Sequence, residues 1–264
     1  MGKKEIAVVI GGSRGIGFVI ANALYMHGYR VLITGKSKGN LNAAVKRAEK
    51  ESIVLEIYCM DATRESDVQE LFEYIGSCGK LCVCVNCVGK NLSKKFVYQN
   101  AEGAIIKHSL EEWERTILLN QTSSFLCCRE AAATMIEQKT EGIIINIATS
   151  LWKGAYAQCA YTAAKAAVIS MTRSIAVELS RYGIRCMAVA PGAIIGDALR
   201  TACEKSERHN EYMDKLKNQV PLKRFAEESE VSEAVLFCVK NKYMTGNIIE
   251  LDGGGYPSKV IFNK

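Results

Sequence analysis

The sequence predicts an α/β protein built on a doubly wound parallel sheet of about seven strands, with helices on both faces. Two observations lead to this class: short β-branched or apolar runs recur along the chain, and stretches with apolar residues at helical spacing lie between them. Strands that alternate with helices are parallel and buried on both faces. Because the chain has three prolines and no linker, repeat or low-complexity segment, residues 1–264 are expected to form a single domain.

The predicted strands are short and rich in Val, Ile, Leu and Cys, as expected for strands between two layers of helices. In chain order they read EIAVVI, RVLIT, IVLEIYC, LCVCVN, GIIINI, RCMAVA and NIIEL, at residues 5–10, 30–34, 53–59, 81–86, 142–147, 185–190 and 247–251. The helices between them repeat apolar residues every three or four positions, so that one side can face the sheet. Their ranges are 18–27, 41–51, 65–75, 110–137, 160–182 and 229–239.

The composition excludes several classes of protein. With 48% hydrophobic and 23% charged residues, the chain is neither disordered nor fibrous. No apolar run approaches the roughly 18–20 residues of a membrane-spanning helix, and the apolar stretch at the start is too short for a secretory signal, so we expect a cytoplasmic protein. The net charge is +6, but the lysines and arginines are interspersed with 28 acidic residues and form no basic stripe, so we expect no nucleic-acid partner. A phosphorylated small molecule is a sufficient partner for this charge.

Cysteine is the other unusual feature of the composition. The eleven cysteines are scattered without C-x-x-C pairs, and the chain has only three histidines. We therefore expect reduced thiols that pack as small hydrophobic side chains, and no metal site.

The segment GGSRGIG at residues 11–17 follows the first predicted strand and leads directly into a helix. Glycines in this place allow a tight turn and a close approach of the backbone to a pyrophosphate, while the helix amino end offers unpaired N–H groups. An ordinary strand-to-helix turn is the alternative, but the position after the first strand favours a dinucleotide. The candidate contacts are Gly11, Ser13, Arg14 and Ile16.

The end of the second predicted strand indicates which dinucleotide binds. Enzymes that use NAD usually carry an acid there for the ribose 2′-hydroxyl, but this chain reads TGKS at residues 34–37. Gly35 leaves room, and Lys36 together with Arg14 can neutralise a 2′-phosphate. The sequence therefore favours NADP(H), the alternative being that both cations are solvated surface residues.

Tyr161 and Lys165 lie four residues apart on the predicted helix 160–182 and therefore share one face. A free tyrosine has a pKa of about 10, too high for proton exchange at neutral pH, and a neighbouring ammonium together with a positive nicotinamide ring would lower it. Such a tyrosine can hand a proton to a carbonyl oxygen. The spacing alone is a weak signal, and its value comes from the motifs that accompany it.

Together, these motifs resemble those of the short-chain dehydrogenase/reductase family, in the family's order and over essentially the whole chain, which implies a Rossmann-like fold. The glycine turn is similar to the family's T-G-x-x-x-G-x-G, with Ile10 where a threonine is usual. The segment NCVG at residues 86–89 resembles the family's N-N-A-G. The resemblance implies that Asn86, Val88 and Gly89 support the sheet and line the adenine-ribose site.

The resemblance implies roles for further residues. Asp61, followed by Ala62, resembles the acid that hydrogen-bonds the adenine amine. Asn120 is placed where the family's helix asparagine holds a water in the proton relay to Lys165. The cofactor contacts implied in the turn that closes over the nicotinamide are Pro191, Gly192 and Ile194.

The chain also departs from the family pattern. The catalytic serine corresponds to Thr149, 12 positions before Tyr161, or to Ser150, 11 positions before it, and either hydroxyl can donate a hydrogen bond to the substrate oxygen. We favour Thr149, which aligns with the second serine of the usual N-I-S-S pattern.

Two further departures concern the nicotinamide and the substrate. Gly196 replaces a threonine near the nicotinamide. The connection 90–106 is long and polar, and either covers the substrate or is a surface excursion.

Within the family, GGSRGIG and the segment VPLKRF at residues 220–225 look like 3-oxoacyl-carrier-protein reductases and related carbonyl reductases. This resemblance implies reduction of a ketone to a secondary alcohol with NADPH, and favours a 3-oxoacyl thioester or similar carbonyl. The alternatives are a dehydrogenase of hydroxysteroids or other secondary alcohols, and a catalytically silent NADP(H)-binding subunit. An acyl carrier protein is a candidate partner, and a homotetramer or homodimer is the implied assembly.

Substrate selection is expected in loops near residues 90–110 and 193–220, where no motif constrains the chemistry. The residues expected to line the substrate are Ser150, Trp152 and Tyr156.

Overall fold

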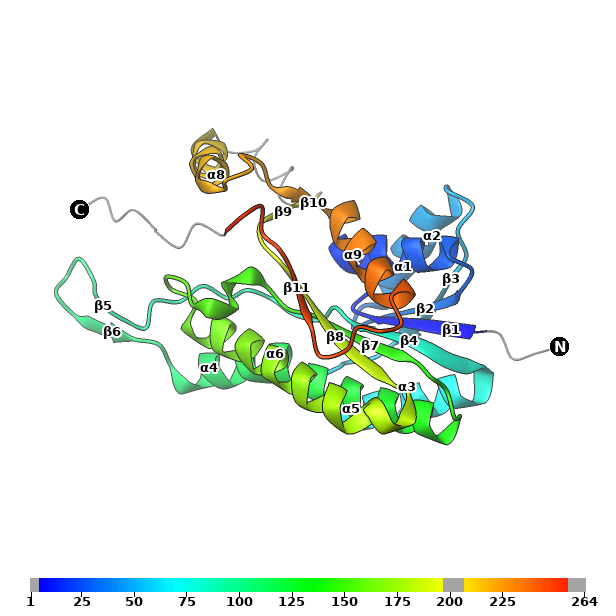
Figure 1. Cartoon of the computed structure of the whole chain (residues 1–264). Coiled ribbons are helices and arrows are strands. Elements are labelled where there is room, and N and C mark those ends of the chain that lie inside the picture. The colour runs from blue at the N-terminus through cyan, green and yellow to red at the C-terminus, as the bar shows by residue number, and fades with distance from the viewer. Residues whose placement is uncertain (1–4, 197–206, 256–264) are drawn as a thin grey trace.

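The computed structural model describes residues 5–196 and 207–255. Its centre is a parallel sheet of seven strands in the order β11-β8-β7-β4-β1-β2-β3, so the chain starts in the middle and builds outward in both directions (Figure 1). This order confirms the predicted doubly wound fold. The strands are β1 (Glu5–Ile10), β2 (Arg30–Gly35), β3 (Leu55–Cys59), β4 (Lys80–Asn86), β7 (Ile143–Ile147), β8 (Arg185–Pro191) and β11 (Ile248–Leu251).

Helices cover both faces of this sheet. One face carries α1 (Gly15–Met26), α2 (Lys38–Glu49) and α9 (Glu228–Lys240) (Figure 1). The opposite face carries α3 (Glu65–Cys78), α5 (Ser123–Glu137) and α6 (Cys159–Leu179). A three-residue 3₁₀ turn, Ser180–Tyr182, extends α6. The predicted helices end within about three residues of these bounds, which is the usual uncertainty of capping signals.

The core lies in two layers because side chains along each strand alternate between the faces of the sheet. In β1, Ile6, Val8 and Ile10 pack with residues of α3 and α5, whereas Ala7 and Val9 pack with residues of α1 and α9. A strand with both faces buried is apolar at every position, which explains the continuous apolar runs in the sequence.

The predicted helix 110–137 consists of three pieces: α4 (Leu110–Ile117), a π-helical turn (Leu118–Thr122) and α5. In the wider π turn, Asn120 is fully buried and its Nδ2 donates a hydrogen bond to the carbonyl of Thr116, at 3.0 Å. Single π turns recur at functional sites, since they turn one side chain out of the helical register. Apolar periodicity does not reveal such a turn.

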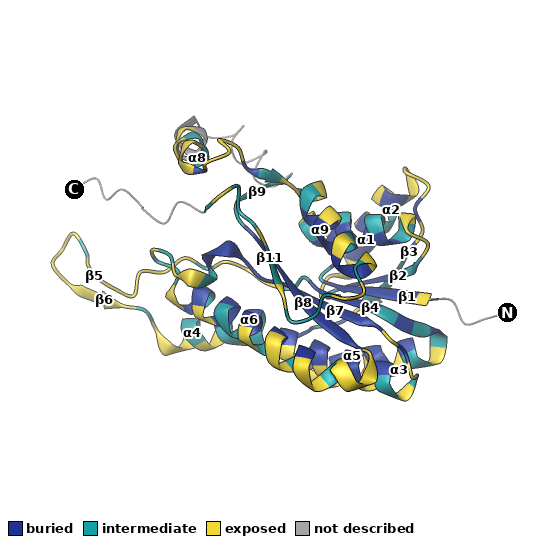
Figure 2. Ribbon diagram, viewed as in Figure 1, coloured by how far each residue is buried: buried dark blue, intermediate teal, exposed yellow. Residues whose placement is uncertain are grey.

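The two expected substrate loops contain structure that the sequence does not predict. Within residues 90–110, β5 (Val97–Gln99) and β6 (Ile105–Lys107) form an antiparallel hairpin that extends away from the sheet, and both strands are exposed at every position (Figures 1 and 2). Within residues 193–220, the described part holds β9 (Ile194–Ile195) and α8 (Glu207–Gln219). Strand β9 pairs with β10 (Ala226–Glu227). In the part of the chain that the structure describes, no helix is long and apolar enough to cross a membrane.

Candidate active site

The glycine-rich turn between β1 and α1 has the shape that a bound phosphate requires. Gly11 has a φ of +83°, and a Cβ at Gly17 would collide with the carbonyl oxygen of Gly11. Helix α1 begins without a side-chain cap and has no acidic residue in its first turn. The N-cap residue therefore does not cover the first N–H groups of α1, and the helix dipole favours an anion there. These residues fit the pyrophosphate of a dinucleotide.

The adenine end of the predicted cofactor site brings Lys36 and Asp61 together. Lys36 Nζ lies 2.7 Å from Asp61 Oδ2, and Thr63 donates hydrogen bonds to Asp61 Oδ1 from its backbone N and its hydroxyl. Partial burial raises the pKa of Asp61, but the hydrogen bonds from Lys36 and Thr63 outweigh it and lower the pKa. The charge of Lys36 is thus largely offset, whereas exposed Arg14 forms no ion pair within residues 5–196 and 207–255.

The other residues predicted to contact the adenine end of the cofactor also lie near the carboxyl ends of strands. A Cβ at Gly35 would lie 3.3 Å from Ser13 Oγ, and one at Gly11 would lie 3.2 Å from Val88 Cγ2. Ile16 and Val88 pack partly against the core on opposite faces of the sheet, and Ala62 is buried. The structure thus places these residues around the carboxyl ends of β1, β2 and β4, and their contact with a cofactor remains a prediction.

The side chain of Asn86 points into the protein. Its Nδ2 donates hydrogen bonds to Asn146 Oδ1 at 2.8 Å and to Cys128 Sγ at 3.2 Å, and Asn146 Nδ2 in turn donates to Thr172 Oγ1 at 2.9 Å. This buried network joins the ends of β4 and β7 to α5 and α6. Asn86 therefore supports the sheet, and a role in the cofactor site would involve its backbone.

The predicted proton relay converges at the end of β4. A Cβ at Gly89 would lie 2.8 Å from Asn120 Oδ1 and 3.1 Å from Lys165 Nζ, so three segments far apart in the sequence meet here. Asn120 is held by hydrogen bonds to both backbone groups of Lys90, with its Oδ1 accepting at 3.0 Å and its Nδ2 donating at 3.2 Å. Tyr161 lies one helical turn before Lys165 on α6 and is half-buried.

Lys165 is 3% exposed, and its Nζ donates a hydrogen bond to the carbonyl of Ile147, at 2.9 Å. Burial disfavours the ammonium form and lowers the pKa of Lys165 to about 8. Buried lysines are rare unless they are paired, which makes this side chain a functional candidate.

Both candidate hydroxyls lie just after β7. Thr149 is buried, and its Oγ1 donates to the carbonyl of Pro191 and accepts from the N–H of Leu151, each at 3.3 Å. Ser150 is also buried, and its Oγ has no hydrogen-bond partner among the described residues. A buried hydroxyl without a partner is unusual, so Ser150 keeps its place beside Thr149 as a candidate donor to the substrate.

The turn after β8 lies beside the last strand. Gly192 donates from its backbone N–H to the carbonyl of Leu251 at 2.8 Å, and Ile194 continues into β9.

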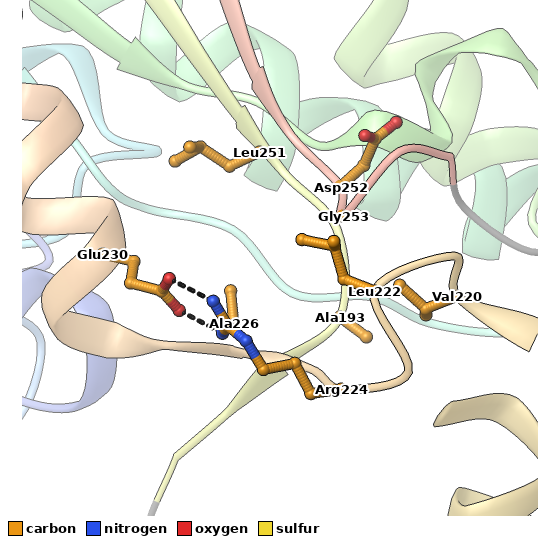
Figure 3. Close-up of a pocket in the computed structure, with 9 residues that line it drawn as sticks. All are labelled: Ala193, Val220, Leu222, Arg224, Ala226, Glu230, Leu251, Asp252 and Gly253. Atoms are coloured by element: carbon orange, nitrogen blue, oxygen red, sulfur yellow. Dashed lines mark hydrogen bonds and ion pairs between the residues drawn. The ribbon is translucent and has the colours of Figure 1, made fainter. Parts of the chain in front are cut away.

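A cavity of 130 Å³ lies next to Ala193. Its walls include Val220 and Leu222, and Arg224 forms two hydrogen bonds of 2.7 Å with Glu230 there (Figure 3). Substrate pockets usually hold roughly 300–1,000 Å³, so this cavity is too small for a whole substrate.

Trp152 and Tyr156 occupy different surroundings. Trp152 packs against a small buried cluster that includes Ala148 and Ile169, and its Nε1 donates to Glu250 at 3.0 Å, so it is anchored to the edge strand β11. Tyr156 is exposed, in the segment that leads to Tyr161. The roles predicted for both at the substrate stay predictions.

The long connection after Gly89 reaches the same segment. Lys94 donates from its backbone N–H to the carbonyl of Ala157 at 2.8 Å, and Gln158 Nε2 donates to Ser93 Oγ at 2.7 Å. The base of the β5–β6 hairpin therefore lies against the residues just before Tyr161. Whether the loop covers the substrate or is a surface excursion stays a prediction.

The described cysteines are free thiols, and several are buried. Burial raises the pKa of Cys87 to about 11, which disfavours the reactive thiolate. Among the side chains that the structure describes, no group of three or more His, Cys, Asp or Glu is arranged to hold a metal ion. Cys203 lies outside the described residues.

Comparison with known proteins identifies the family of this chain. The family profile described as enoyl-(acyl carrier protein) reductase matches residues 10–255. The human protein named 3-oxoacyl-(acyl-carrier-protein) reductase is 31% identical over 252 residues, which are 95% of this chain and 97% of the human protein. Carbonyl reductase family member 4 of Danio rerio is 32% identical with the same coverage.

A solved structure of a putative gluconate dehydrogenase from Agrobacterium tumefaciens matches with a TM-score of 0.83 and 29% identity, over 96% of each chain. The family profile, the relatives and the fold thus agree, and the chain belongs to the short-chain dehydrogenase/reductase family of oxidoreductases, which use a nicotinamide cofactor.

Proposed function

We propose that the protein is an NADPH-dependent reductase that converts a ketone to a secondary alcohol, with a 3-oxoacyl thioester as the favoured substrate. The observation that carries this proposal is the meeting of Lys165, Asn120 and Gly89 at the end of β4, one helical turn from Tyr161. These groups form a proton path that a protein which only binds nucleotide does not need.

When bound, the nicotinamide supplies the hydride for the substrate carbon. Tyr161 gives its phenolic proton to the substrate oxygen. The ammonium of Lys165 lowers the pKa of that phenol and would also hold the ribose of a bound cofactor. Asn120 holds the water through which Lys165 replaces the proton, and the hydroxyl of Thr149 or Ser150 stabilises charge on the oxygen.

The residues of the β5–β6 hairpin support the proposal that the substrate is carried on an acidic protein. Phe96 is 68% exposed, and the basic residues Lys90, Lys95 and Lys107 lie along this connection, whereas Lys94 is paired with Glu112 at 2.8 Å. A positively charged, partly apolar arm beside the substrate end of the site suits an acyl carrier protein, whose thioester must reach Tyr161.

Exposed apolar side chains on the helices α4 to α6 support the proposal that the protein assembles into a homotetramer or homodimer. Leu110, Leu118 and Phe125 follow one another at intervals of about two helical turns, and all three are exposed. Val177 of α6 is 77% exposed. Apolar side chains in such rows are often covered by another subunit.

The proposed function is tested by following the absorbance of reduced nicotinamide. NADPH and NADH are compared with an acetoacetyl group on coenzyme A or on acyl carrier protein, and with a quinone, a diketone and ketosteroids. We expect turnover with NADPH and the acetoacetyl thioesters, faster on the carrier protein. Preferred turnover of ketosteroids would support the alternative substrate class, and tight NADPH binding with no turnover would indicate a silent subunit.

Arg14 is expected to provide most of the preference for NADPH. In Arg14→Gln the Kd for NADPH rises by about 10- to 100-fold, because a charge-assisted hydrogen bond to the 2′-phosphate contributes about 1.5–3 kcal/mol. The Kd for NADH stays within about twofold. Lys36→Gln has a smaller effect, since Asp61 already offsets its charge. Fluorescence titration of both variants checks this, and equal loss of NADH binding in Arg14→Gln would contradict it.

A further inference from the structure

Glu228, the first residue of α9, extends its carboxylate toward two turns that are distant in the sequence. A Cβ at Gly15, the first residue of α1, would lie 3.5 Å from Glu228 Oε1. A Cβ at Gly196 would collide with the same oxygen and lie 3.0 Å from Glu228 Cδ. The carboxylate is therefore located between the start of α1 and the turn that follows β8.

Another observation places this carboxylate near the end of β4. Cys87 follows β4, and burial is the main reason for its raised pKa. The negative charge of Glu228 raises that pKa further, and the positive charge of Lys165 lowers it. Both charges therefore act on one thiol that follows β4, and Glu228 lies at the edge of the sheet where the strands have their carboxyl ends.

This location is unfavourable for an anionic ligand. In doubly wound sheets the pyrophosphate of a dinucleotide binds at the amino end of the first helix, which in this chain is Gly15. A carboxylate beside the same N–H groups is attracted by the helix dipole and repels phosphate. Glu227 and Glu230 form the capping box at the amino end of α9, so the carboxylate of Glu228 is not needed to cap its own helix.

We propose that Glu228 competes with the phosphates of the dinucleotide for the amino end of α1 and thereby weakens cofactor binding. This inference rests on the proposed function. Gly196 leaves room for this carboxylate, because any side chain at position 196 would occupy the same space. Cofactor binding requires the carboxylate of Glu228 to leave the amino end of α1.

The test compares Glu228→Gln with Glu233→Gln. Glu233 is an exposed acid on the same helix, so its removal is a matched control for charge. Fluorescence or calorimetric titration measures Kd for NADPH, for ADP-ribose, which has a pyrophosphate but no nicotinamide, and for adenosine 2′-monophosphate, which has no pyrophosphate. We expect Glu228→Gln to bind NADPH and ADP-ribose about tenfold more tightly, with adenosine 2′-monophosphate unchanged within about twofold and Glu233→Gln unchanged throughout.

Gly196→Ala tests the same contact from the other side. Its methyl group displaces the carboxylate, so we expect tighter ADP-ribose binding in the wild-type background and no further gain in Glu228→Gln. Unfolding midpoints without ligand establish that each variant is folded.

Unchanged or weaker binding in folded Glu228→Gln would overturn the inference, as would an equal gain for adenosine 2′-monophosphate. Failure of the wild-type protein to bind NADPH or NADH would instead overturn the proposed function.

Discussion

Tyr161→Phe is expected to lower kcat for carbonyl reduction by about 10²- to 10⁴-fold, the range that a positioned proton donor contributes. The substitution removes one oxygen from a half-buried side chain on α6 and leaves Lys165 in place. Because the lost group acts on the substrate oxygen during the reaction, KM and the Kd for NADPH should change little. Steady-state kinetics with an acetoacetyl thioester and titration with NADPH measure both.

The matched control for this prediction is Tyr243→Phe. Tyr243 is 99% exposed in the connection between α9 and β11, so loss of its hydroxyl should leave kcat unchanged within about twofold. A kcat for Tyr161→Phe within about tenfold of wild type would show that another group donates the proton, and the serine or threonine after β7 would be examined next.

Lys165→Met is expected to lower kcat by about 10²-fold or more and, at the same time, to raise the free energy of unfolding. Loss of activity follows from removal of the charge that lowers the pKa of Tyr161. The gain in stability follows from burial: the fall in the pKa of Lys165 from 10.5 to about 8 corresponds to about 3 kcal/mol of desolvation cost. Leaving the carbonyl of Ile147 without its hydrogen bond costs about 1–2 kcal/mol, so a net gain of about 1–2 kcal/mol remains at pH 7.

The sign of this effect depends on pH. Since the pKa of Lys165 is lower in the folded state than in the unfolded state, the cost of the buried charge is present in full below about pH 8. The cost falls as the pH rises from about 8 to 10.5, because the folded protein then holds the neutral amine. Urea unfolding at pH 7 and at about pH 10 measures the change, and the advantage of Lys165→Met should disappear at the higher pH.

Lys240→Met is the matched control for stability. Lys240 is exposed in the last turn of α9, so its loss should change the free energy of unfolding by less than about 0.5 kcal/mol. If Lys165→Met were less stable than wild type at pH 7, the hydrogen bond to Ile147 would outweigh the desolvation cost, and Lys165 would be a structural residue as well as a functional one.

Periodicity in the sequence was sufficient to predict the layers of the fold, because a strand buried on both faces is apolar at every position. It did not predict the β5–β6 hairpin. The segment FVYQNAEGAIIK at residues 96–107 forms strands with both faces exposed, so no pattern of burial distinguishes it from a loop. The π turn at Asn120 was also missed, since one extra residue in a helical turn hardly disturbs an apolar repeat.

The sequence by itself determined the strands, the glycine turn and the spacing of Tyr161 and Lys165, because each of these features depends on residues that are close together in the chain. Only the tertiary structure decided that Lys165 is buried beside Gly89 and Asn120, that Asp61 offsets Lys36, and that Glu228 reaches Gly15. These contacts join the ends of separate strands and helices. They depend on where the chain crosses the sheet, and local periodicity carries no information about that.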